Sequence, residues 1–313
     1  MTAKKTAGII IKLAIVIALF YYIGHTVITD WDAVRSFDWR IDPLFMALSC
    51  IGFITAYATL AGIWRIVLES FGYRIQFRSA WAIYFIGNLG RYIPGKVWTV
   101  AGVAYMGNKV GIPPVITGTA AVCAQAYAIL SSFVFFILFF IFINTALFKA
   151  GFLWAVPVPV ILILIFMVPR NLERMLNVIL TRLGKEEVAI LLSIGTAVKI
   201  TFLYLCSWFV FGFAFWLFVS SIAGAGTFNL LYLTGVYAVS YVTGYLALFA
   251  PGGIGVREGI MSILLTSVIS PGVAAVVAVL SRLMVTVVEL LCVGIVFFQK
   301  GAIYGKEKKE TRT

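Results

Sequence analysis

A long hydrophobic stretch of this chain is interrupted by Ala250-Pro251-Gly252-Gly253-Ile254-Gly255-Val256-Arg257-Glu258. Residues 228–249 before the interruption and the residues from Gly259 to Ile269 after it are almost entirely apolar. The second of these limbs is shorter than the ~20 residues that a helix needs to cross ~30 Å of hydrocarbon. A Pro-Gly turn between two such limbs therefore predicts a helix that is broken inside a membrane.

A second interruption of the same kind lies upstream, at Gly90-Arg91-Tyr92-Ile93-Pro94-Gly95-Lys96. It separates two apolar limbs, residues 79–90 and 97–107. Each limb would form roughly 17 Å of helix, about half of a bilayer. Because basic residues flank both ends, the limbs predict a re-entrant hairpin that enters from the cytoplasm. The interruption after residue 249 predicts a second hairpin, which enters from outside.

The composition excludes a soluble protein. Hydrophobic residues make up 62% of the 313 and charged residues 12%, whereas soluble domains carry about 25% charge. The apolar runs are continuous rather than alternating, so we predict an all-α polytopic membrane protein. The net charge of +12 follows the sides of the membrane, which makes it a topology signal, and no nucleic-acid partner is expected.

Six transmembrane helices account for the remaining hydrophobic runs. The predicted spans are residues 7–29, 43–63, 115–143, 152–168, 200–221 and 271–298. Lysines near both ends of the chain place the N- and C-termini in the cytoplasm, and the protein in a cell (inner) membrane. If residues 228–249 spanned fully instead, the lysine-rich tail would lie outside, against the positive-inside rule.

The order of span, hairpin and span occurs twice, which divides a single membrane domain into two repeats of opposite orientation. This inverted topology is typical of transporters. The divisions are residues 1–42 (first span and outer loop), 43–143 (repeat one), 144–199 (connector), 200–298 (repeat two) and 299–313 (basic cytoplasmic tail). Within the connector, residues 169–187 alternate arginines with leucines at a helical period, which predicts an amphipathic helix on the inner leaflet.

Six charged residues fall within the predicted membrane region. They are Arg91, Lys96, Arg257, Glu258, Arg282 and Glu289. Each would cost about 2.5–3.5 kcal/mol at a helix centre, so such residues usually face a cavity or a partner. One interpretation is structural ion pairing of Arg257 or Arg282 with Glu258 or Glu289. The other starts from the excess of four basic over two acidic groups, which predicts a bound anion.

The Pro-Gly turns favour a phosphate group as that anion. Glycine allows a ligand close to the backbone, and a helix that begins after the turn points free N–H groups at it. The predicted substrate-binding residues are Arg91, Pro94, Gly95, Lys96, Pro251, Gly252, Gly253, Gly255, Arg257, Glu258, Arg282 and Glu289. The expected partner is a phospholipid or a polyprenyl-phosphate lipid, with homo-oligomers left open. We predict no catalytic residue, metal or cofactor.

These two motifs, followed by Arg282, resemble the lysylphosphatidylglycerol synthase transmembrane family, over nearly the whole chain. The upstream motif departs from the family pattern, since Val97-Trp98 and Met106 replace a small residue and an arginine. The resemblance implies lipid flipping by the membrane part and aminoacyl transfer by a separate soluble part in two-domain members. Because this sequence ends without a soluble part, aminoacyl-tRNA chemistry is not expected.

These features are compatible with three functions. The leading one is a flippase-like lipid translocase with a cationic site in mid-membrane. The second is a glycosyl or other transferase with a polyprenyl-phosphate donor, in which Asp30, Asp32 and Asp38 of the outer loop would act; the alternative for these residues is a solvated acidic loop. The third is a channel or a small-solute or ion transporter. No Walker A motif occurs, so ATP hydrolysis is not expected.

Overall fold

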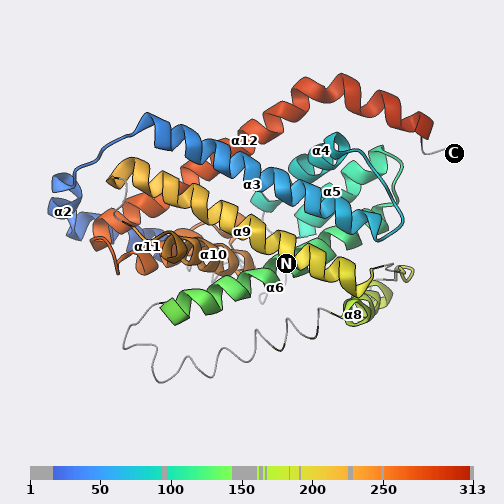
Figure 1. Cartoon of the computed structure of the whole chain (residues 1–313), viewed down its shortest axis with the longest axis horizontal. Coiled ribbons are helices and arrows are strands. Elements are labelled where there is room, and N and C mark those ends of the chain that lie inside the picture. Colours follow the sequence, from blue (N-terminus) through green and yellow to red (C-terminus); the bar gives the residue numbers. More distant parts are fainter. Residues whose placement is uncertain are drawn as a thin grey trace, which may run out of the picture. The chain divides into compact units, whose positions relative to one another are not determined.

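The computed structural model describes residues 17–93, 97–142, 161, 165, 168–182, 184–189, 192–224, 228–247 and 250–310. Within these ranges, the side chains of 136, 138–142 and 298–310 are left aside. The described residues form helices and turns and contain no strand, which confirms the all-α prediction (Figure 1).

The helices follow one another in this order: Ile17–Thr29, α2 (Trp31–Ser36), α3 (Pro43–Glu69), α4 (Phe77–Asn88), η1 (Leu89–Tyr92), α5 (Val97–Lys109), α6 (Pro114–Phe142), α8 (Pro169–Arg182), α9 (Ile194–Ala223), α10 (Leu230–Leu246), η4 (Pro251–Gly253), α11 (Val256–Leu265) and α12 (Pro271–Glu310). The start of α3 shows why the sequence begins a helix there. Asp42 Oδ1 accepts hydrogen bonds from the N–H groups of Leu44 (2.9 Å) and Phe45 (3.1 Å), as an N-cap residue does.

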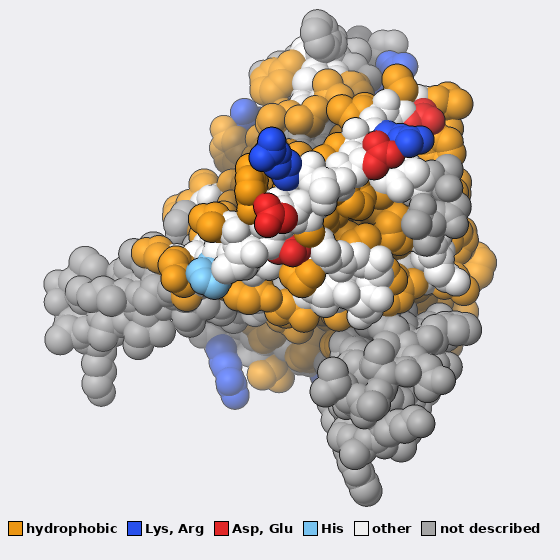
Figure 2. All heavy atoms as spheres, turned by 90° about the vertical axis from the view of Figure 1, so that its left-hand side faces the viewer, with side chains coloured by type: hydrophobic (Ala, Val, Ile, Leu, Met, Phe, Trp, Pro, Cys, Tyr) orange, Lys and Arg blue, Asp and Glu red, His pale blue; other side chains and the backbone are white. Residues whose placement is uncertain are grey.

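Four helices are long and apolar enough to cross a membrane: α3, α6 over Pro114–Phe135, α9, and α12 over Pro271–Phe297. They coincide with four of the six predicted spans. The first predicted span is described only as the shorter helix Ile17–Thr29, and 152–168 lies almost wholly outside the described residues. Figure 2 shows one face of the molecule, whose described surface is mostly hydrophobic or uncharged. The number of six spans stays a prediction.

Both predicted interruptions form helical hairpins. Helices α4 and α5 pack against each other, and the short 3-10 turn η1 lies between them in the chain. Helices α10 and α11 also pack against each other, with η4 between them (Figure 1). In the first hairpin Gly102 lies against the backbone of α4, where a Cβ would come within 2.5 Å of the carbonyl oxygen of Gly87. Glycine thus lets the two helices approach closely. The re-entrant position of both hairpins stays a prediction.

The chain forms two compact units. The first unit contains residues 1–53, 91–96 and 210–288, and the second contains 54–90, 97–209 and 289–313. An aromatic group of Phe53, Phe211 and Tyr237 occupies the interior of the first unit. The core of the second unit includes Trp64 and Tyr127, each 1% exposed. These two units do not coincide with the two repeats predicted from the sequence, residues 43–143 and 200–298. The repeats stay a prediction.

Candidate functional site

The turn between α10 and α11 takes a conformation that requires glycine. Gly252, Gly253 and Gly255 have φ angles of +58°, +72° and +85°, which side chains disfavour. A Cβ on Gly253 would also come within 2.7 Å of the carbonyl oxygen of Gly244 in α10. The turn therefore folds tightly back on the end of α10 and places the start of α11 beside it.

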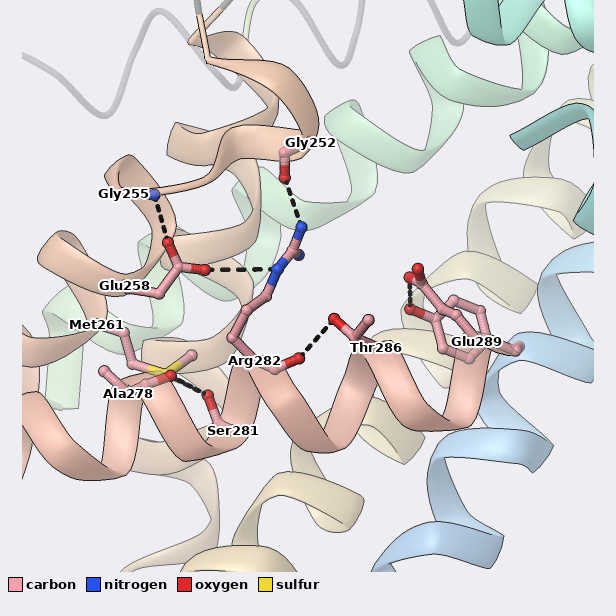
Figure 3. A network of polar contacts seen from close by, with 10 residues as sticks. Gly252, Gly255, Glu258, Met261, Ala278, Ser281, Arg282, Thr286 and Glu289 are labelled. Atoms are coloured by element: carbon pink, nitrogen blue, oxygen red, sulfur yellow. Dashed lines mark hydrogen bonds and ion pairs between the residues drawn. The ribbon is translucent and has the colours of Figure 1, made fainter. Parts of the chain in front are cut away.

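Glu258 and Arg282 meet at this turn, as Figure 3 shows. Glu258 lies in the first turn of α11, and its Oε2 accepts a hydrogen bond of 2.6 Å from the N–H of Gly255. Its Oε1 lies 3.6 Å from Nε of Arg282 on α12. Nη2 of Arg282 donates to the carbonyl oxygen of Gly252 at 3.1 Å. The side chains of Arg282 and Glu258 are 13% and 6% exposed, so the pair ties α12 to the turn from within the protein.

Arg257, the neighbour of Glu258, lies against aromatic rings of α10. Its guanidinium carbon is 4.7 Å from the ring centre of Tyr237 and 5.6 Å from that of Tyr241. The ring of Tyr241 stacks in turn on that of Tyr245, with centres 6.4 Å apart. Tyrosine faces attract a cation through their quadrupole, so this face of α10 stabilises the buried guanidinium.

The tip of the first hairpin belongs to the same unit as the second hairpin. The ring centre of Tyr92 lies 6.0 Å from the guanidinium carbon of Arg282. A Cβ on Gly252 would be 3.6 Å from Cδ1 of the same tyrosine. Arg91 lies close enough to Tyr245 for an electrostatic interaction. The two interrupted segments, about 160 residues apart in the sequence, therefore approach each other at Arg282.

Glu289 lies two turns after Arg282 on α12, in the second unit, where its Oε1 accepts a hydrogen bond from the hydroxyl of Tyr57. Both side chains are buried. Pro94, Gly95 and Lys96 lie outside the described residues.

The charges of the first unit bear on both sequence interpretations. Among the predicted charged residues that the structure describes, this unit holds Arg91, Arg257 and Arg282 with one carboxylate, Glu258. The contact between Arg282 and Glu258 is one of the ion pairs that the structural interpretation named. The three arginines and one carboxylate leave this group of four with a positive formal charge, as the anion interpretation requires.

Sequence reasoning missed the aromatic part of this region. Tyr92 lies at the tip of the first hairpin, against the guanidinium of Arg282. On α10, Tyr237 and Tyr241 contact the guanidinium of Arg257, and Tyr245 stacks on Tyr241. A signal was present, because the three tyrosines of α10 recur every four residues and so share one face of a helix. That spacing alone did not indicate which cation would lie on them.

The acidic outer loop has structural contacts. Asp30 Oδ2 accepts a hydrogen bond of 2.7 Å from the N–H of Gly272, in the first turn of α12. Asp38 pairs with Arg40 at 2.5 Å, and the hydrogen bond and charge of Asp38 raise the pKa of Arg40 above its ordinary value. Among the described residues, no three His, Cys, Asp or Glu side chains are grouped to hold a metal ion. Asp30 thus has a structural contact with α12, and the transferase interpretation of the loop stays a prediction.

The family model described as the lysylphosphatidylglycerol synthase TM region matches residues 9–294. This range contains both hairpins and every residue predicted for the site, and it confirms the resemblance noted in the motifs. Together with the four long apolar helices, the match shows a multi-pass membrane protein. No curated protein matches the chain.

Proposed function

The chain belongs to the lysylphosphatidylglycerol synthase TM region family, and on that premise we propose that it is a lipid translocase. It moves a phosphate-bearing headgroup between leaflets through a cationic site inside the membrane, while the acyl chains stay in the bilayer. The two hairpins are re-entrant from opposite sides, within an inverted repeat whose termini both face the cytoplasm.

One observation carries the proposal: Tyr92 of the first hairpin and Gly252 of the second both contact Arg282. If each hairpin enters from a different side, this is where a headgroup would pass from one side to the other. Nε of Arg282 lies 3.6 Å from Oε1 of Glu258, and its Nη2 donates to the backbone carbonyl of Gly252. A phosphate oxygen could replace that carbonyl as acceptor, exchanging a neutral hydrogen bond for a stronger charge-assisted one.

Arg257 and Arg91 would offset the negative charge of a headgroup that is bound at Arg282. The guanidinium group of arginine is planar and always charged, and its two parallel N–H groups can donate to two oxygens of one phosphate. Glu258 has the complementary role, because it holds Arg282 in place when no headgroup is present. Outward movement of one net negative charge gains about 2.3 kcal/mol per 100 mV of inside-negative potential, so the translocase needs no nucleotide.

The first test follows a fluorescent phospholipid in reconstituted vesicles, by its accessibility to an impermeant quencher. We expect the wild type to expose inner-leaflet lipid and Arg257→Ala to do so at least about tenfold more slowly, since a hydrogen bond to a charged group contributes about 1.5–3 kcal/mol. The matched control is Arg35→Ala, an exposed arginine of α2, which should keep the wild-type rate.

Thermal unfolding in detergent accompanies each rate, so that loss of fold is not mistaken for loss of transport. If Arg257→Ala fails to fold, Arg257→Lys replaces it, because lysine keeps the charge and loses the planar fork. An unchanged rate in a folded variant would contradict the proposed site, and no transport by the wild type would contradict the function.

A further inference from the structure

Helix α8 (Pro169–Arg182) has an exposed apolar stripe that the transport site does not explain. One side of the helix packs into the core of the second unit, with Leu172 1% and Leu176 4% exposed. The neighbouring side carries Met175, Val178 and Ile179, which are 36%, 50% and 45% exposed. The helix is therefore apolar on a wider arc than its contact with the unit covers.

Basic side chains border this exposed stripe. Arg174, Val178 and Arg182 follow one another every four residues, so they form one row along the helix; Arg170 extends it by one turn, and all three arginines are exposed. Glu173, the one acidic residue of α8, is half-buried and lies on the side away from Val178. The surface thus combines apolar residues with a row of positive charge.

The helix cannot easily turn to hide the stripe, because it is fixed to the unit at two places. Besides the buried leucines, Asn177 forms two hydrogen bonds with the backbone of Val188: its Nδ2 donates to the carbonyl oxygen (3.2 Å), and its Oδ1 accepts from the N–H (3.0 Å). The segment after α8 is folded back by this contact, and it leaves Met175 and Ile179 exposed.

We propose that this surface binds the anionic phospholipid headgroups of the adjacent leaflet, at a site separate from the translocation path. Met175, Val178 and Ile179 lie at the level of the upper acyl chains, and the three arginines reach the phosphates around them, as in interfacial amphipathic helices. Positive charge selects anionic over zwitterionic lipid, by about 1 kcal/mol for each arginine near the surface. Because arginines near a membrane surface favour the cytoplasmic side, we assign this leaflet as the cytoplasmic one.

The selectivity is measured with the full chain in phosphatidylcholine vesicles that contain phosphatidylglycerol, from the association of spin-labelled forms of each lipid. We expect a preference for phosphatidylglycerol that Arg170→Gln/Arg174→Gln/Arg182→Gln largely removes, since each arginine favours an anionic headgroup by about fivefold. The preference should also weaken from 0.1 to 1 M salt, because the screening length falls from about 10 to 3 Å.

The control removes charge elsewhere, from the two exposed arginines of the predicted outer loop: Arg35→Gln/Arg40→Gln. This variant should keep the preference. The same loss of preference per charge removed in both variants would show an effect of net charge alone, and an unchanged preference in the α8 variant would show that these arginines bind no lipid; either result overturns the proposal.

A second measurement tests the apolar stripe, with an impermeant thiol reagent and the four cysteines replaced by alanine. Val178→Cys should react far more slowly in vesicles than Lys185→Cys, an exposed residue just beyond the helix. Equally fast reaction would place the stripe in water or under a soluble partner. If Val178→Cys reacts slowly only at a high ratio of protein to lipid, a second copy of the chain covers the stripe. Both outcomes overturn the proposal, and neither depends on whether the protein transports lipid.

Discussion

At the scale of residues, Arg282 and Glu258 have contacts that fit two different roles. Arg282 donates to Gly252 and lies beside Glu258, which would stabilise the turn even in a protein that binds no lipid. Truncating one member of a buried ion pair costs about 3–5 kcal/mol, largely because the other charge is left unpaired. A single substitution therefore cannot separate a ligand site from a structural pair.

The glycine turn gives a prediction about stability alone. Gly253→Ala should destabilise the protein by about 1–3 kcal/mol, since its φ of +72° is strained for any side chain and its Cβ would meet the carbonyl oxygen of Gly244. The matched control is Gly294→Ala in α12, where no atom of the described residues outside its own helical turns lies within 4 Å of the added Cβ. Thermal unfolding in the same detergent measures both. Equal stability of the two variants would show that the turn tolerates a side chain.

At the scale of elements, the sequence predicted helices and hairpins well and their ends less well. α9 begins at Ile194, whereas the predicted span began at 200 because Lys199 ends the apolar run. α12 likewise continues to Glu310, well past the predicted end at 298. In both cases charge ends the hydrophobic pattern without ending the helix, since Lys and Glu are good helix formers. The short helix α2 was not predicted within the acidic loop.

The contact between Asp30 and α12 joins elements from the two ends of the chain. Asp30→Ala should lower stability by about 0.5–2 kcal/mol, because the first turn of α12 loses the acceptor for the Gly272 N–H. Asp32→Ala, at an exposed residue of α2, should have almost no effect on unfolding. Vesicle transport should persist in both folded variants, whereas a transferase that uses this loop would lose sugar transfer in both.

At the scale of the whole molecule, the sequence predicted two interrupted helices but not where their tips would lie. Arg91 and Tyr92 group with the second hairpin in the first unit, while the helices α4 and α5 that carry them belong to the second unit. That grouping depends on contacts across about 160 residues of sequence. The contact between Tyr92 and Arg282 follows from the same grouping, and no pattern within a single segment contains it. The contacts of Arg257 with Tyr237 and Tyr241 lie within the second hairpin.

The topology is tested by the side from which introduced cysteines react, again with the native cysteines replaced. Asn229→Cys and Ser270→Cys flank the second hairpin and should both react from outside. Gln76→Cys and Asn108→Cys lie at the two ends of the first hairpin and should both react from the cytoplasm. Lys185→Cys serves as the cytoplasmic reference. Labelling of Asn229→Cys and Ser270→Cys from opposite sides would show that α10 and α11 do not form a re-entrant hairpin.

The most direct test of the central claim is lipid transport by Arg282→Met/Glu258→Gln, which removes both charges of the buried pair together. Because no unpaired ion is left behind, this variant should unfold close to the wild-type temperature. We predict that it nonetheless loses transport of the fluorescent phospholipid, by at least about tenfold, since the phosphate loses a charged donor. A stable double variant that moves lipid at the wild-type rate would show that the pair serves the fold and that the headgroup does not bind there.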